Sequence, residues 1–261
     1  MKLGRLIGFH AVMARLSKHP ESVVELFADA RREDARMAEL KTLAARVGLE
    51  LQRVDGARLA ALAQSPDHQG VVALVEQVGL AASLQDVLTA VEGRTEPGLF
   101  LLLDQVQDPH NLGAAMRSAA AFGVDAVIVP RHGAAPRSPA AQKAASGAFE
   151  LTPLIEVVNL VQAIEALQQA GVWIYGAESD AEGTLFDVPL DGPIAWVLGN
   201  EGRGLRRLTR ERCDRRIAIP MQGAIESLNV SVAAAICLFA TRAERYRRAA
   251  DPMGSRRKRP R

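Results

Sequence analysis

The chain of 261 residues has little of several features that mark specialised classes of protein. Aromatic residues make up only 4%, which disfavours a single-strand binder that stacks bases on aromatic rings. The formal net charge is only +2, so we do not expect a protein that coats nucleic acid without selectivity. Hydrophobic residues at 48% and charged residues at 24% are ordinary for a globular protein with a sizeable core.

Cysteine and histidine are also scarce. The two cysteines, Cys213 and Cys237, form no CxxC pair, and we expect free thiols in a reducing cytoplasm. The five histidines are scattered without the spacing of a metal site, so no metal is predicted. No apolar run is long enough to span a bilayer, and His10 and Arg15 interrupt the first apolar stretch, which argues against a signal peptide. We therefore expect a cytoplasmic protein without a membrane partner.

The pattern of apolar residues divides the chain into two regions. Residues 1–76 alternate short helical and strand-like pieces and are expected to form a small α/β domain. Residues 77–97 are assigned as a linker and lead-in helix, and residues 98–250 as a second domain. The basic tail over 251–261 is expected to be disordered, either as a solvated terminus or as an arm that neutralises RNA phosphates. In the first region, helices are predicted over 9–16 and 35–47, and strands over 49–54 and 71–75.

Five continuous apolar runs mark the second region as an α/β fold. Runs that are apolar on both faces are typical of buried parallel strands, and helical segments fall between them. In such sheets ligands bind at the carboxyl ends of the strands, so functional residues are expected there. The predicted strands are 99–103, 126–129, 172–175, 194–198 and 217–219, and the predicted helices are 84–91, 111–122, 160–170 and 227–248.

A polar segment follows the predicted strand over 99–103. Asn111 is the expected N-cap of the next helix, and Arg117 lies in the second turn of that helix. Taken alone, this segment indicates a capped helix with a solvated arginine rather than a site.

Two further polar segments follow the strands over 194–198 and 217–219. The first, Gly199–Leu205, holds three glycines that let the backbone approach a ligand closely, in a spacing that is neither the dinucleotide fingerprint nor a P-loop. In the second, Pro220 ends the strand, and Ser227 and Asn229 are expected to begin a closely packed helix.

In this order, the three segments resemble the three signature motifs of the TrmH-type SPOUT methyltransferases. The matching segments are Asn111–Ser118, Gly199–Leu205 and Ile217–Ala233. Gly8–Val12 and His68–Gly70 further resemble the small L30e-like RNA-binding domain of the family members that methylate a guanosine of 23S rRNA. The resemblance covers roughly residues 4–248, nearly the whole chain.

The resemblance implies an α/β trefoil-knot domain with a parallel sheet, and such a knot cannot be derived from periodicity. It also implies that S-adenosylmethionine is the methyl donor and that the substrate is a ribose 2′-hydroxyl of 23S rRNA. The protein would be a homodimer in which each active site is completed across the interface. The residues expected to bind the cofactor, bent in the knot, are Gly199, Asn200, Gly202, Ile219, Met221, Ser227 and Leu228.

The same resemblance assigns catalysis to Arg117, Asn111, Glu201, Asn229 and Ser231. The arginine would act either as the base or as a clamp on the substrate phosphate. Freeing a neutral arginine at pH 7 costs about 7 kcal/mol, which favours the clamp. Glu201 is expected to organise the glycine loop or to pair with an arginine.

Two alternatives stay open. The chain could be a tRNA or other rRNA 2′-O-methyltransferase with the same motifs, although tRNA-specific relatives commonly lack the amino-terminal module. It could also be an RNA-binding ribosome-assembly factor that keeps the fold without catalysis. The intact set of Asn111, Arg117, Glu201 and Asn229 favours an enzyme.

Overall fold

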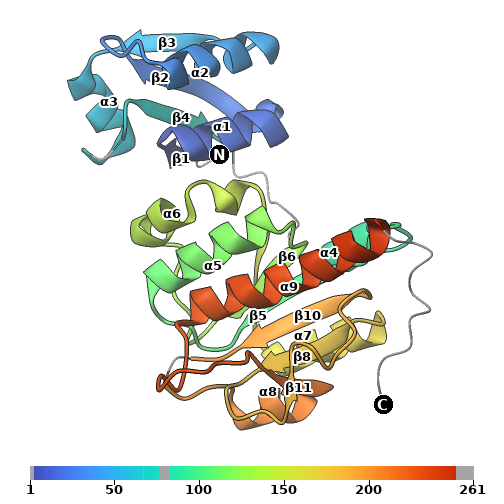
Figure 1. Cartoon of the computed structure of the whole chain (residues 1–261). Coiled ribbons are helices and arrows are strands. Elements are labelled where there is room, and N and C mark those ends of the chain that lie inside the picture. The colour runs from blue at the N-terminus through green and yellow to red at the C-terminus, as the bar shows by residue number, and fades with distance from the viewer. Residues whose placement is uncertain (1–2, 67, 77–82, 201, 251–261) are drawn as a thin grey trace. The chain divides into compact units, whose positions relative to one another are not determined.

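The computed structural model describes residues 3–66, 68–76, 83–200 and 202–250 (Figure 1). The chain splits into two compact units, Met1–Leu80 with Ser146–Leu151, and Ala81–Ala145 with Thr152–Arg261. Within the described ranges, no helix is both long and apolar enough to cross a membrane. The same ranges hold no group of three or more histidine, cysteine, aspartate or glutamate side chains that could bind a metal ion.

The first unit is built on a four-stranded mixed sheet in the order β1-β4-β2-β3. Strands β2 and β3 are parallel, and β4 runs antiparallel to both β1 and β2. Alternate residues of each strand point to opposite faces, so α1 and α2 cover one face and α3 covers the other. The elements are β1 Gly4–Ile7, α1 Phe9–Lys18, η1 Pro20–Ser22, β2 Val23–Asp29, α2 Ala35–Arg46, β3 Leu51–Val54, α3 Gly56–Ala63, β4 Val71–Val75 and η2 Ala148–Glu150.

Strand β2 is absent from the predicted strands, and the structure gives a reason. Its pairing with β4 shifts register between Val23 and Glu25, which is a β-bulge or irregularity. A bulge interrupts the alternation of apolar and polar residues by which a strand is recognised in a sequence.

The second unit is built on a seven-stranded sheet in the order β7-β6-β5-β10-β8-β11-β9, and all of its described pairings are parallel. This confirms the predicted parallel α/β fold. The strands are β5 Leu99–Leu103, β6 Ala126–Pro130, β7 Leu154–Val157, β8 Trp173–Ala177, β9 Gly183–Thr184, β10 Ile194–Leu198 and β11 Arg215–Ala218. The helices are α4 Leu84–Val91, α5 Pro109–Ala121, α6 Pro139–Ala145, α7 Leu160–Gln169, α8 Arg207–Arg212 and α9 Val230–Ala250.

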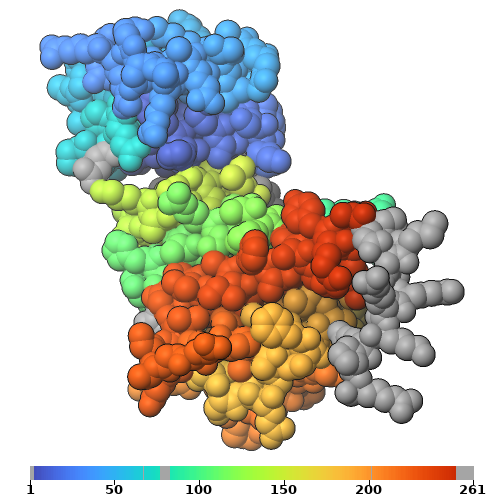
Figure 2. Space-filling view, viewed as in Figure 1, coloured from blue at the N-terminus to red at the C-terminus, as the bar shows by residue number. Residues whose placement is uncertain are grey.

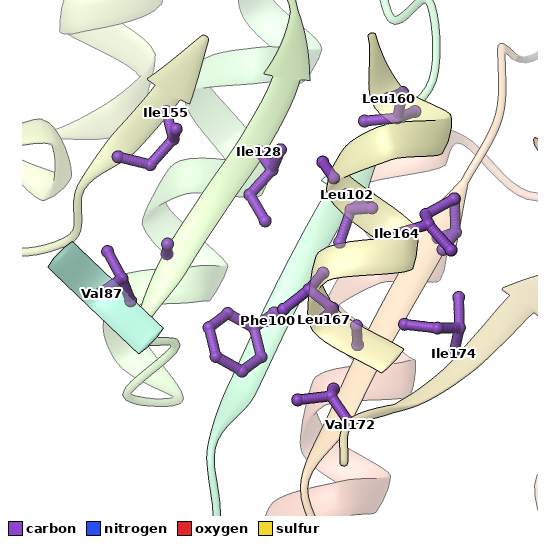
Figure 3. Packing of buried hydrophobic residues seen from close by; sticks show 14 of the residues in the cluster. Val87, Phe100, Leu102, Ile128, Ile155, Leu160, Ile164, Leu167, Val172 and Ile174 are labelled. Carbon is purple, nitrogen blue, oxygen red and sulfur yellow. The ribbon is translucent and has the colours of Figure 1, made fainter. Parts of the chain in front are cut away.

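Helices cover both faces of this sheet. On one face, α4 and α7 pack on a cluster of aliphatic side chains and Phe100 (Figure 3). On the other face α9 lies beside α5, and the indole of Trp196 in β10 donates a 2.9 Å hydrogen bond to the Thr241 hydroxyl of α9. The central strands β5 and β10 are buried along their whole length, which rigidly positions the loops at their carboxyl ends.

The residues that cap the N-termini of α5 and α9 can be compared with the predicted ones. Asp108, not Asn111, is the N-cap of α5: its carboxylate accepts the His110 N–H at 2.9 Å, and Pro109 occupies the first helical position. The prediction for Asn111 was therefore wrong, and this residue lies within the first turn. Asn229 immediately precedes α9, and its side-chain oxygen accepts the Ser231 N–H at 2.9 Å, as a helix-starting residue should.

Candidate functional site

The carboxyl ends of three neighbouring strands meet at one edge of the parallel sheet. In the register of these strands, Ala177 of β8 lies between Leu198 of β10 and Ile217 of β11. The polar segments that follow the three strands therefore gather at the same place, although they are far apart in the sequence.

The glycine loop after β10 folds tightly on itself. The backbones of Asn200 and Gly204 exchange two hydrogen bonds, of 3.1 and 2.8 Å. A side chain at Gly199 would overlap the backbone of Gly204 and the nitrogen of Leu205, and Gly204 has a φ of +63°. Glycine is therefore needed at both positions for the loop's own conformation, as well as for any close approach of a ligand.

A cavity of about 290 Å³ opens at this edge. The structure brings together all seven residues that were predicted to bind the cofactor, because each of them lines this cavity. These residues are Gly199, Asn200, Gly202, Ile219, Met221, Ser227 and Leu228. Leu198 and Val230 supply apolar wall. Arg203 of the glycine loop supplies charge, as do Glu178, Asp180 and Arg210, which lie outside the three motifs.

Glu178 is the most buried of these additional charged residues. Its side chain is only 4% exposed, and its Oε1 atom accepts hydrogen bonds from Nε and Nη2 of Arg210 at 2.9 and 2.6 Å. These hydrogen bonds raise the pKa of Arg210 above its usual value. The sequence signal for Glu178 was the polar run Glu178-Ser179-Asp180, which comes two residues after the strand predicted over 172–175.

The two residues that follow β5, Asp104 and Gln105, form hydrogen bonds to both ends of the glycine loop. The buried carboxylate of Asp104 accepts the backbone N–H of Arg206 at 3.0 Å and its Nε at 2.7 Å. The carbonyl of Gln105 accepts a hydrogen bond from the Asn200 side chain at 3.1 Å. Gln105 has a φ of +61°, a conformation that is uncommon for residues other than glycine and that concentrates at functional sites.

Three of the predicted catalytic residues form one hydrogen-bonded group. The Asn229 Nδ2 atom donates to Oδ1 of Asn111 at 2.9 Å, and Oδ1 of Asn229 accepts the Ser231 hydroxyl at 2.6 Å. This group joins the first turn of α5 to the start of α9. Asn111 also lines a second cavity, of about 350 Å³, which adjoins the first.

Of the other two predicted catalytic residues, only Arg117 is described, and it is not brought to this group. Arg117 is exposed on α5 and, within the described part of the chain, is not among the residues that line either cavity. Glu201 lies outside the described residues.

Both cysteines are free, as predicted. Burial raises the pKa of each thiol to about 12. Because the thiolate is the reactive form, we expect neither cysteine of the native protein to be alkylated by iodoacetamide at pH 8, while both react after denaturation. Mass spectrometry of the labelled chain measures this, and rapid labelling of native Cys213 would contradict it.

Comparisons with known proteins place both regions of the chain in known families. Residues 98–239 match the SpoU rRNA Methylase family, and residues 5–80 match the family described as RNA 2′-O ribose methyltransferase substrate binding. The chain is 48% identical to the 23S rRNA (guanosine-2′-O-)-methyltransferase RlmB of Nitrosomonas europaea, over 90% of each chain. It is also 48% identical to the enzyme of that name from a Burkholderia species, over 95% of this chain and 99% of the relative.

A solved structure extends the match to three dimensions. The SpoU methyltransferase AviRb from Streptomyces viridochromogenes, determined in complex with its cofactor AdoMet, has a TM-score of 0.74 and 26% identity. The alignment covers 94% of this chain and 91% of that one. The fold class is thereby confirmed as a substrate-binding domain with a mixed sheet followed by a methylase domain with a parallel sheet. The chain therefore belongs to the SpoU rRNA methylase family.

Proposed function

We propose that this protein transfers a methyl group from S-adenosylmethionine to the ribose 2′-hydroxyl of a guanosine in 23S rRNA, in the cytoplasm. The observation that carries the proposal is the cavity at the sheet edge, which gathers all seven expected cofactor residues. The comparisons support the same function, because two relatives that are 48% identical over at least 90% of each chain are 23S rRNA (guanosine-2′-O-)-methyltransferases.

The chemistry of the cavity fits this cofactor. Leu198, Ile219 and Leu228 offer apolar surface to an adenine ring, and the carboxylate of Asp180 can accept hydrogen bonds from ribose hydroxyls. Arg203 and Arg210 can pair with the carboxylate of the methionine part. When bound, the cofactor supplies a methyl group that its positive sulfur activates for displacement.

The residues of this chain then have to position the acceptor hydroxyl and manage its proton. Positioning of two reactants supplies a large part of the rate in such a displacement. Asn111 lines the second cavity, and the hydrogen-bonded group that it forms with Asn229 and Ser231 would orient the ribose there. We assign Arg117 the clamping of the substrate phosphate, because a guanidinium binds phosphate with two parallel hydrogen bonds.

Arg117→Lys distinguishes the clamp from a base. Lysine has a pKa near 10.4, so a lysine acting as base would keep substantial activity that rises between about pH 7 and 9. A clamp that depends on the planar guanidinium predicts near-total loss of methyl transfer throughout this range. Single-turnover rates against pH, with cofactor affinity measured in parallel, decide between the two roles.

We further propose that the protein is a homodimer whose active sites are shared between subunits. Three apolar residues of α9 recur every seven positions and therefore lie on one face: Val232, Phe239 and Tyr246. Their side chains are 47%, 60% and 75% exposed, and α9 lies open at the surface in Figure 2 (orange to red). An exposed apolar stripe beside the helix that carries Arg117 suits an interface that would deliver this arginine to the partner's cavities.

Phe239→Glu is expected to convert the dimer to a monomer and to abolish methyl transfer, because it places a charge in the middle of the stripe. Sedimentation equilibrium measures the mass. Phe186→Glu is the matched control, since Phe186 is 81% exposed in another part of the same unit, and it should leave the dimer intact. A dimeric Phe239→Glu variant would contradict the proposed interface.

We assign one role to each of the predicted domains. Residues 1–76 would bind the RNA, 77–97 would link the domains, and 98–250 would carry methyl transfer. The match of residues 5–80 to the substrate-binding family favours rRNA over tRNA, because tRNA-specific relatives commonly lack this module. Residues 77–82 and the basic tail over 251–261 lie outside the described residues.

Labelled S-adenosylmethionine and unmodified 23S rRNA test the function directly. We expect one 2′-O-methylated guanosine with the full chain and none with Arg117→Ala. Labelling of tRNA alone would assign the protein to the tRNA-modifying members of the family. Cofactor binding without transfer to any RNA or pre-ribosomal particle would favour a ribosome-assembly factor.

A further inference from the structure

The second cavity identifies where the target nucleoside lies, if the proposed function holds. It shares Asn200, Gly202 and Val230 with the cofactor cavity. A methyl group passes only between atoms in contact, so the acceptor ribose has to lie directly beside the cofactor. The adjoining cavity satisfies this condition.

The lining of this cavity suits a base rather than a phosphate. None of the described residues that line it is lysine or arginine, so it offers no cation to an anion. The buried side chains of Val106 and Val230, each 4% exposed, supply apolar surface for the face of a ring. The exposed side chains of Gln107 and Asp108 add polar groups to the lining.

Asp108 lines this cavity, and its carboxylate is held in place at the start of α5. One of its oxygens accepts the His110 N–H at 2.9 Å, which caps α5, and Pro109 restrains the backbone between them. An ionised carboxylate has about four acceptor sites, so capping uses only part of its capacity. The remaining acceptors are available to a ligand in the cavity.

Guanine is the base that fits such a group. It presents two adjacent donors, the N1–H and the 2-amino group, and a carboxylate has only acceptors. Adenine and cytosine each place a ring acceptor beside their amino group, and uracil flanks its N–H with two carbonyls, so all three would set an acceptor against the carboxylate. We propose that Asp108 selects guanine at the target position by accepting hydrogen bonds from these two donors.

Asp108→Asn tests the proposal while keeping the helix cap, because asparagine caps helices as well as aspartate does. The substrates are two fragments of 23S rRNA that carry guanosine or inosine at the methylated position, since inosine lacks the 2-amino group. We expect the unmodified enzyme to prefer guanosine by about tenfold or more in kcat/KM. The variant should lose about tenfold or more on guanosine and less than about twofold on inosine, so that the preference disappears.

Asp55→Asn is the matched control, because Asp55 caps α3 by accepting the Arg58 N–H at 2.7 Å in the other unit. This control should keep both rates. Unchanged melting temperature and cofactor affinity would show that Asp108→Asn is folded. Equal losses on both fragments, or no loss on guanosine, would overturn the role of Asp108 and leave the proposed function standing. Failure of the unmodified enzyme to methylate the guanosine fragment would overturn the proposed function and this inference with it.

Discussion

Gly199→Ala is expected to weaken cofactor binding by at least about 100-fold, which corresponds to about 2.8 kcal/mol. The added methyl group would overlap the backbone of Gly204 and the nitrogen of Leu205, and backbone atoms cannot move aside as the end of a long side chain can. The loop therefore has to open, and the cavity that it lines changes shape.

Titration calorimetry with S-adenosylmethionine measures this loss. Gly192→Ala is the control, because no atom lies within 4 Å of the position that its Cβ would take and its φ is not positive. Wild-type affinity in Gly199→Ala would contradict the role that we give to the tight loop.

The largest effect is expected when two inactive variants are combined. Arg117→Ala should lose about 100- to 1,000-fold in methyl transfer, as is usual when one donor to the transition state is removed, while it keeps its cofactor affinity. Gly199→Ala should be equally inactive for lack of cofactor. If each site joins the cavity of one subunit to Arg117 of its partner, a mixed dimer regains one complete site.

Random pairing makes half of the dimers mixed, and each mixed dimer has one working site of two, so about a quarter of the wild-type rate should return. Co-refolding the two variants and measuring transfer to 23S rRNA tests this. Each variant refolded alone gives the background rate of methyl transfer. A mixture that stays inactive, although mass spectrometry shows mixed dimers, would place Arg117 and the cavity within the same subunit.

Several elements followed directly from the sequence, because their determinants are local. The strands at 99–103 and 194–198 were predicted with the bounds that the structure shows, since a strand buried on both faces is a continuous apolar run. The helix over 84–91 was also predicted with its observed bounds, and the capping box of Ser83 and Asp86 begins it. The trefoil knot stays a prediction from the resemblance.

The residues predicted to bind the cofactor came from the family resemblance that the three motifs carry. Each motif follows a strand, and the carboxyl ends of neighbouring parallel strands lie at one edge of the sheet. The resemblance implied that Gly199, Ile219 and Leu228 contact one ligand, and the structure places all three in the lining of one cavity.

Only the tertiary structure revealed the supports of this site. Asp104 pairs with Arg206, 102 residues away in the sequence, and Glu178 pairs with Arg210, 32 residues away. Pairs this far apart produce no periodic pattern in a sequence. The structure also moved the cap of α5 from Asn111 to Asp108, which lines the second cavity. Local propensity and periodicity determine which segments become strands, helices and loops, whereas the partners of a polar side chain depend on strand order, which the packing of the whole sheet decides.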